Sequence, residues 1–158
     1  MSINFIQEDC SKVEYYTNLT AVSNWLEINL SDYDWHFADV DGDWFDLNDP
    51  EPKWLTGEEL DLKLKDNNIQ FIWAVISAYP KGAPPKLDNQ VYADGNPIFW
   101  TGSPKKQLKD SLFEIVCWDS SATLFIGLPL NLGQNLIKNA PGIKDLDLEN
   151  QKRIPFNF

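Results

Sequence analysis

The chain has 158 residues, of which 43% are hydrophobic and 13% aromatic, and its net charge is −11 at neutral pH. This aromatic content excludes a disordered acidic chain, and the length suffices for a single domain with its own core. Residues 1–66 hold 16 acidic and four basic residues, whereas residues 67–158 hold eight and nine. Because such an acidic half repels nucleic acid and anionic membranes, we expect neither as a direct partner.

The first 16 residues, MSINFIQEDCSKVEYY, lack the basic and apolar regions of a signal peptide. The longest apolar run, residues 69–79, is too short to cross a bilayer. Cys10 and Cys117 lie far apart in the sequence and show no metal-type spacing. We therefore expect a cytoplasmic protein with two reduced thiols.

The first predicted elements are short. Residues 12–18 fit either a capped helix start or an alternating strand, and both interpretations stay open. The stretch TAVSNWLEINL, residues 20–30, places Val22, Trp25 and Leu26 on one helical face. This spacing predicts a short amphipathic helix.

Two aromatic-rich runs, residues 33–40 and 43–48, flank Asp41 and Gly42. Asp-Gly is typical of a type I′ turn, which needs a positive φ at both central residues. The pattern therefore predicts a β-hairpin with its turn at these two residues.

A second strong signal is the capping-box sequence Thr56-Gly-Glu-Glu59, which predicts a helix that continues to about Asp66. The following run IQFIWAVISAY, residues 69–79, is almost entirely apolar and predicts a central strand buried on both faces. The proline-rich residues 80–90 predict an irregular, exposed loop.

The rest of the chain predicts a series of short elements. In order, these are a hairpin of residues 91–93 and 98–100, a helical turn from Ser103 to Lys109, a hairpin of residues 112–118 and 122–128, a helix over residues 131–139, and a polar tail after Gly142. Helices grouped around hairpin-linked strands indicate one α+β domain, residues 1–158, with a mainly antiparallel sheet.

The acid-rich stretch ADVDGDWFDLNDPE, residues 38–51, raises the question of a calcium site. An EF-hand loop that begins at Asp39 needs Gly at its sixth position and Glu at its twelfth, where this chain has Trp44 and Pro50. Gly42 at the fourth position leaves a looser calcium loop as an alternative. Our main expectation is that the chain has no resident metal and no cofactor.

In the predicted hairpin register, one face carries apolar residues suited to a core, and the other mixes aromatic residues with acids. Residues 32–51 contain eight acids and no Lys or Arg. Aromatic residues dominate interface energies, and acids steer the encounter with a basic partner. We therefore predict a partner-binding surface made of Asp39, Asp41, Asp43, Asp46, Asp49, Glu51, Trp35 and Trp44. The alternative is that these aromatics are half-buried and the acids only solvate a turn.

Catalysis has little support in the sequence. His36 is the only histidine, and neither Cys10 nor Cys117 has an activating sequence context. Phosphate-binding loops and hydrolase or metalloprotease motifs do not occur. We therefore expect a protein that is not an enzyme.

In overall character this small acidic chain resembles the immunity proteins of bacterial polymorphic and contact-dependent toxin systems. The resemblance covers the chain as a type and transfers no residue roles. It implies a cytosolic domain that neutralises a cognate toxin, often a cationic nuclease. The alternatives are an acidic regulator or DNA mimic of a nucleic-acid-binding protein, and a calcium-dependent or Trp-mediated carbohydrate-binding module.

Overall fold

The computed structural model describes residues 3–42, 53–67, 69–82 and 90–153. Within these ranges, seven strands form one sheet in the order β3-β2-β4-β5-β6-β1-β7, and every neighbouring pair is antiparallel. The predicted α+β class with a mainly antiparallel sheet is confirmed. The strands are β1 Phe5–Glu8, β2 Asp34–Gly42, β3 Lys53–Thr56, β4 Phe71–Tyr79, β5 Phe113–Trp118, β6 Ala122–Ile126 and β7 Ile143–Asp145.

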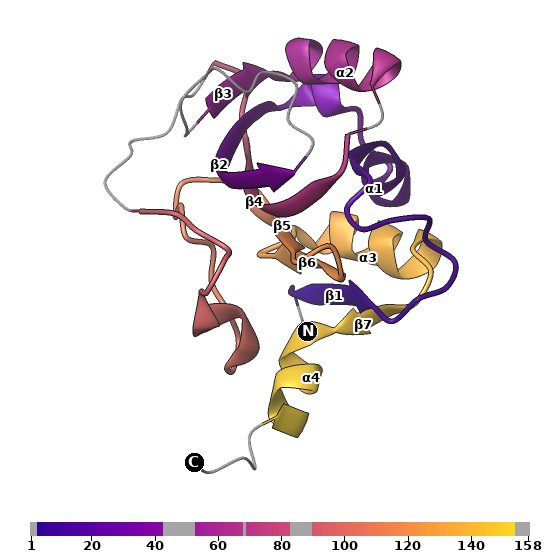
Figure 1. Cartoon of the computed structure of the whole chain (residues 1–158), viewed down its shortest axis with the longest axis vertical. Coiled ribbons are helices and arrows are strands. Elements are labelled where there is room, and N and C mark those ends of the chain that lie inside the picture. The colour runs from indigo at the N-terminus through magenta and orange to yellow at the C-terminus, as the bar shows by residue number, and fades with distance from the viewer. Residues whose placement is uncertain (1–2, 43–52, 68, 83–89, 154–158) are drawn as a thin grey trace.

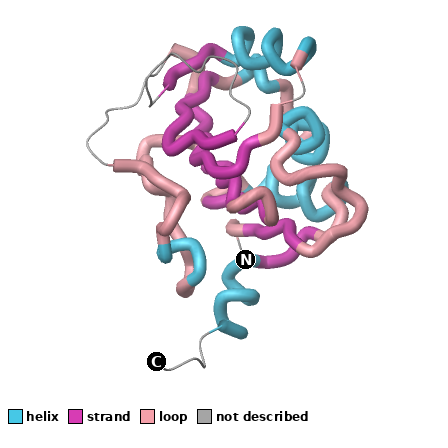
Figure 2. The backbone as a smooth tube through the Cα atoms, viewed as in Figure 1, coloured by secondary structure: helices cyan, strands magenta, loops and turns pink. Residues whose placement is uncertain are grey.

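The helices are short and lie around this sheet (Figure 1). They are α1 Leu19–Leu26, α2 Gly57–Asp66, α3 Leu130–Asn139 and α4 Leu146–Arg153, with 3₁₀ turns η1 Leu30–Asp32 and η2 Pro97–Trp100. Figure 1 shows α1 and α3 on one side of the sheet, and the segment that contains η2 on the other. Figure 2 shows how much of that second side is covered by loop instead of helix.

Side chains alternate between two buried clusters, one on each face of the sheet. The first cluster packs Trp35, Ile76 and Phe113 against the apolar sides of α1, α2 and α3. The second packs Val75, Val116 and Leu124 against residues 91–108 and Leu146 of α4. We call this second side the loop-covered face. Because both faces are covered, β4 is largely apolar on both sides, as predicted for residues 69–79.

Local signals correctly predict several elements. In the predicted capping box of α2, Thr56 Oγ1 accepts the N–H of Glu59 at 3.1 Å, and Glu59 Oε1 accepts the N–H of Thr56 at 3.0 Å. The strand β4, the β5–β6 hairpin and α3 also agree with the predicted segments to within two residues. Residues 12–18, left open by the sequence, are neither helix nor regular strand.

The predicted turn at Asp41-Gly42 is wrong. Both residues belong to β2 and pair with β4, Asp41 with Trp73 and Gly42 with Phe71. A Cβ on Gly42 would lie 2.6 Å from the carbonyl oxygen of Gln70, so glycine serves a close approach of two backbones. The strand that pairs with β2 on its other edge is β3, and residues 43–48 lie outside the described residues.

The hairpin predicted for residues 91–93 and 98–100 is also wrong. The turn at Asp94-Gly95 exists, but Asn96 Oδ1 accepts the N–H of Ile98 at 3.2 Å and starts the 3₁₀ turn η2. Side chains take the place of a partner strand, since Gln107 Oε1 accepts the N–H of Tyr92 at 3.1 Å. A polar side chain from elsewhere in the fold has overridden the local signal.

Two further predictions fail near the C-terminal end. Ser103 does not cap a helical turn, because its hydroxyl donates to Asp147 Oδ2 at 2.7 Å. The predicted polar tail instead contains β7, which pairs with β1, and α4, in which Leu146 is fully buried. These segments have weak local signals and are ordered by long-range contacts.

Candidate functional site

Trp35 does not belong to an exposed binding surface, which corrects the prediction. Its side chain is 0% exposed, and its Nε1–H donates to the carbonyl oxygen of Leu30 at 2.9 Å. The ring packs edge-on against Tyr33 and Phe113 with centroids 5.6 and 6.0 Å apart. The burial follows from the covering of both faces of β2, so Trp35 is a core residue with a satisfied indole N–H.

Asp39 lies at a β-bulge. Its φ is 54°, and the pairing of β2 with β4 gains one residue between Ala38 and Asp41. One carboxylate oxygen, Oδ2, accepts the N–H groups of Ala93 at 2.8 Å and Asp94 at 2.9 Å. Asp39 therefore holds the start of the 91–111 segment on the loop-covered face.

The bulge also decides where Asp41 lies. An extra residue in one strand moves the following side chains to the opposite face. Val40 consequently packs against the first cluster, and exposed Asp41 is the register neighbour of Trp73, a residue of the loop-covered face. The predicted acid is thus brought beside an aromatic residue, but beside Trp73 instead of Trp35.

The other predicted binding residues are not placed. Asp43, Trp44, Asp46, Asp49 and Glu51 all lie outside the described residues. Their roles stay predictions from the sequence.

A tryptophan cluster continues from Trp73 across the loop-covered face. The rings of Trp73 and Trp118 have centroids 4.7 Å apart at 73°, and those of Trp100 and Trp118 are 4.9 Å apart at 82°. All three side chains are half-buried at the rim of the second core cluster. We call Asp41, Trp73, Trp100 and Trp118 the Asp–Trp surface.

The binding surface predicted from the sequence did not include these three tryptophans. A signal was present, because Trp118 ends β5 directly before the turn residue Asp119, which is exposed. Trp73 likewise lies near the beginning of β4, where its neighbour Ile72 is 36% exposed. Strand ends are half-covered positions, where an amphipathic indole is well suited.

One cation already contacts this cluster. The Cζ atom of Arg153, the last residue of α4, lies 4.9 Å from the centroid of the Trp100 ring. Arg153 Nη2 also lies 3.5 Å from Glu8 Oε1. This geometry is that of a cation–π contact, so the surface binds a guanidinium group within its own chain.

A buried polar row lies on the loop-covered face, beneath the 91–111 segment. His36, Ser77 and Glu114 are direct register neighbours on β2, β4 and β5 and are 2%, 0% and 0% exposed. Both His36 ring nitrogens, Ser77 Oγ and Glu114 Oε1 have no hydrogen-bond partner among the described residues. Burial lowers the pKa of His36 and raises the pKa of Glu114 to about 7, although the N–H groups of Gln107 and Leu108 and the charge of Lys106 oppose the latter shift.

This row is not arranged for nucleophilic catalysis. Ser77 lies between the other two residues and donates no hydrogen bond to His36, whereas an activated serine donates its hydroxyl hydrogen to a base. The thiol of Cys117 is equally inert, because burial raises its pKa to about 12.

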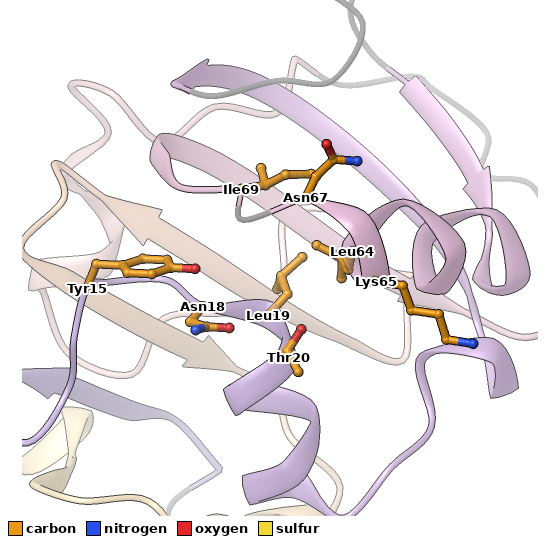
Figure 3. A pocket seen from close by; sticks show the side chains of 8 residues that line it. All are labelled: Tyr15, Asn18, Leu19, Thr20, Leu64, Lys65, Asn67 and Ile69. Atoms are coloured by element: carbon orange, nitrogen blue, oxygen red, sulfur yellow. The ribbon is translucent and has the colours of Figure 1, made fainter.

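A separate groove of about 400 Å³ lies between the start of α1 and the end of α2 (Figure 3). It is lined by Tyr15, Asn18, Leu19, Thr20, Leu64, Lys65, Asn67 and Ile69. Two of its polar groups have structural roles, since Asn18 Oδ1 accepts the N–H of Ala21 and Asn67 Nδ2 donates to the carbonyl oxygen of Lys63. The groove therefore offers few free polar groups to a ligand.

Within the described residues, no three His, Cys, Asp or Glu side chains are grouped so that they could hold a metal ion. No helix in the same part of the chain has the length and apolar character needed to cross a membrane.

Comparison with protein-family models, curated proteins and solved structures finds no match for this chain.

Proposed function

We propose that this chain is a non-catalytic acidic protein that binds and neutralises a basic protein partner, most simply as a cytoplasmic immunity protein against a cognate toxin such as a nuclease. The single observation that carries the proposal is the Asp–Trp surface, in which an exposed acid is the register neighbour of Trp73, the first of three half-buried tryptophans in contact. Acids and indoles together suit a partner rich in cations.

The charge distribution supports fast capture. Residues 1–66 hold 16 acids and four bases, so this part of the chain is strongly negative. Complementary charge raises association rates to roughly 10⁸–10⁹ M⁻¹s⁻¹ at low salt. An inhibitor that must bind a toxin before damage occurs benefits from that rate.

The tryptophan cluster supports slow release. Partly buried Trp residues are enriched among the side chains that dominate interface energies, and such contacts mainly set the dissociation rate. Trp73, Trp100 and Trp118 take the anchoring role that the sequence assigned to Trp35. On sequence grounds alone, the proposal retains Asp43, Asp46, Asp49 and Glu51 as steering charges and Trp44 as an anchor.

The test uses the product of the neighbouring open reading frame. It is expressed in a bacterial host with and without this chain, and growth is measured. Binding of the two purified proteins is then followed by biolayer interferometry at 20 and 500 mM NaCl. We expect rescued growth and an association rate that falls steeply with salt.

Charge reversal locates the surface. Asp41→Lys combined with Asp43→Lys and Asp46→Lys should slow association at low salt by about tenfold or more. Asp39 is left intact because it holds two backbone N–H groups. A matched control reverses exposed Asp9, Glu14 and Asp32, which changes the net charge equally. If both triple variants slow association to the same extent, the binding surface lies elsewhere.

The alternatives give different results in the same series. A non-toxic nucleic-acid-binding product that this chain displaces from DNA would favour the acidic regulator or DNA mimic. A saturable hit on a glycan array, or micromolar binding of Ca²⁺ in a calorimetric titration, would instead favour the carbohydrate-binding module.

A further inference from the structure

The contact between Arg153 and Trp100 has a consequence for the partner. We propose that the tryptophan cluster recognises arginine side chains of the partner, and that Arg153 covers Trp100 until a guanidinium group of the partner replaces it. This inference rests on the proposed function and adds the chemical identity of the recognised group. It also assigns a self-covering role to the end of α4.

The first argument is the preference of the cluster for a planar cation. Trp73 and Trp100 both pack steeply against Trp118, at 73° and 82°, so the three rings brace one another. The guanidinium of Arg153 lies over the Trp100 ring at 4.9 Å. A guanidinium stacks on an indole and is weakly hydrated, whereas an ammonium is compact and strongly hydrated. The cluster should therefore distinguish arginine from lysine.

The second argument is that Arg153 is held weakly enough to be replaced. It is the last residue of α4, and its side chain is 38% exposed. Its ion pair with Glu8 is long, at 3.5 Å, and its Nε atom has no hydrogen-bond partner among the described residues. A long, partly exposed pair of this kind contributes little to stability, so a partner's arginine can replace Arg153.

The third argument is charge. Asp41 is exposed beside Trp73, and Asp119 is exposed directly after Trp118. Among the described residues, the cation in contact with a ring of the cluster is Arg153. An arginine-rich segment thus finds acids next to the indoles, as charge complementarity requires.

The primary test compares nonaarginine with nonalysine peptides as probes of the intact chain. Binding is measured by quenching of tryptophan fluorescence and by calorimetry at 20 and 150 mM NaCl. We expect nonaarginine to bind about fivefold or more tightly than nonalysine at each salt concentration. Trp100→Leu should remove most of this preference. Trp25→Leu, which alters a half-buried tryptophan on the opposite face, should retain it.

Arg153→Ala tests the self-covering role. It should increase the affinity for nonaarginine about threefold, because Trp100 becomes accessible. Lys152→Ala removes the same charge from the adjacent residue, which pairs with Glu149 at 3.0 Å, and should increase the affinity less. Equal increases for the two variants would mean that Arg153 acts only through its charge and would overturn this role.

The outcomes separate this inference from the proposed function. Salt-dependent binding of both peptides with equal affinity overturns arginine recognition and leaves a general cation-binding surface. Failure of both peptides to bind at 20 mM NaCl contradicts the proposed function and this inference together. Thermal melts of each variant show whether a loss of binding reflects unfolding.

Discussion

Glu114 offers the sharpest test of the energetics of this fold. Its side chain is 0% exposed, and Ser77, its neighbour on β4, is also fully buried. Burial raises the pKa of Glu114 from 4.5 to about 7, and the opposing effects of two backbone N–H groups and Lys106 are smaller. We predict that Glu114→Gln stabilises the protein at high pH and has little effect at low pH.

The magnitude follows from the linkage between protonation and folding. Between pH 4.5 and 7 the folded protein holds a proton on Glu114 that the unfolded chain releases, so stability falls as the pH rises. The pKa difference of about 2.5 at 1.36 kcal/mol per unit corresponds to about 3 kcal/mol. Glutamine is neutral at every pH and avoids this loss. The variant should therefore exceed the wild type by up to about 3 kcal/mol at pH 8.

His36 affects the absolute curves in the opposite direction. Its pKa is lowered by burial, so its contribution to stability is present above pH 6.5 and is lost as the pH falls further. The histidine is the same in both proteins. Its effect therefore cancels in the difference between the variant and the wild type, apart from its coupling to Glu114.

The assay is urea unfolding followed by tryptophan fluorescence at pH 4.5, 6 and 8. The matched control is Glu14→Gln, at an exposed carboxylate in the loop before α1. Its free energy of unfolding should change by less than about 0.5 kcal/mol at each pH. A stability difference for Glu114→Gln that is the same at all three pH values would refute the reasoning, because no proton would then be linked to Glu114.

Three further substitutions test contacts that hold the fold together. Asp34→Asn should lower the free energy of unfolding by about 2–4 kcal/mol at neutral pH. Burial alone would raise the pKa of Asp34, but hydrogen bonds from Gly82, Lys81 and Gly57 lower it. The stabilisation by Asp34 is therefore lost as the pH falls below 3.8, and acid unfolding curves should show this loss. Asp39→Ala should cost about 1–3 kcal/mol and increase amide exchange at residues 93 and 94, whose N–H groups it accepts; unchanged exchange would contradict its assigned role. Gly57→Ala should lower the free energy of unfolding by at least about 1–3 kcal/mol in thermal melts, because a Cβ there would lie 2.1 Å from the carbonyl oxygen of Tyr33. An unchanged stability would show that η1 can move away.

Local chemistry made part of the fold predictable. The capping box at Thr56 and Glu59 satisfies backbone groups within four residues, so its meaning does not depend on the rest of the chain. The long apolar run of β4 and the turn between β5 and β6 are likewise self-contained signals. By contrast, β7 and α4 have weak local patterns and depend on contacts with β1 and residue 4.

The candidate site was predictable only in its composition. The sequence indicated that acids and aromatic residues would lie together, and it named Asp39 and Asp41. It placed Asp39 on the same face as Trp35, because strict alternation applies along the strand, and it placed Asp41 in the turn. The bulge at Asp39 breaks that alternation, and it depends on backbone groups more than 50 residues away.

The sequence by itself determined an acidic, aromatic-rich α+β chain with a buried central strand and a capped second helix, because these properties depend on composition or on neighbours along the chain. The tertiary structure alone decided which tryptophans are half-exposed. The two-residue alternation of side chains separates the faces of a strand, but it does not show how completely each face is covered. Here the 91–111 segment covers one face and leaves the rim at Trp73, Trp100 and Trp118 accessible. The same long-range packing turned Gly42 from a predicted turn residue into a point where the backbones of β2 and β4 lie close together.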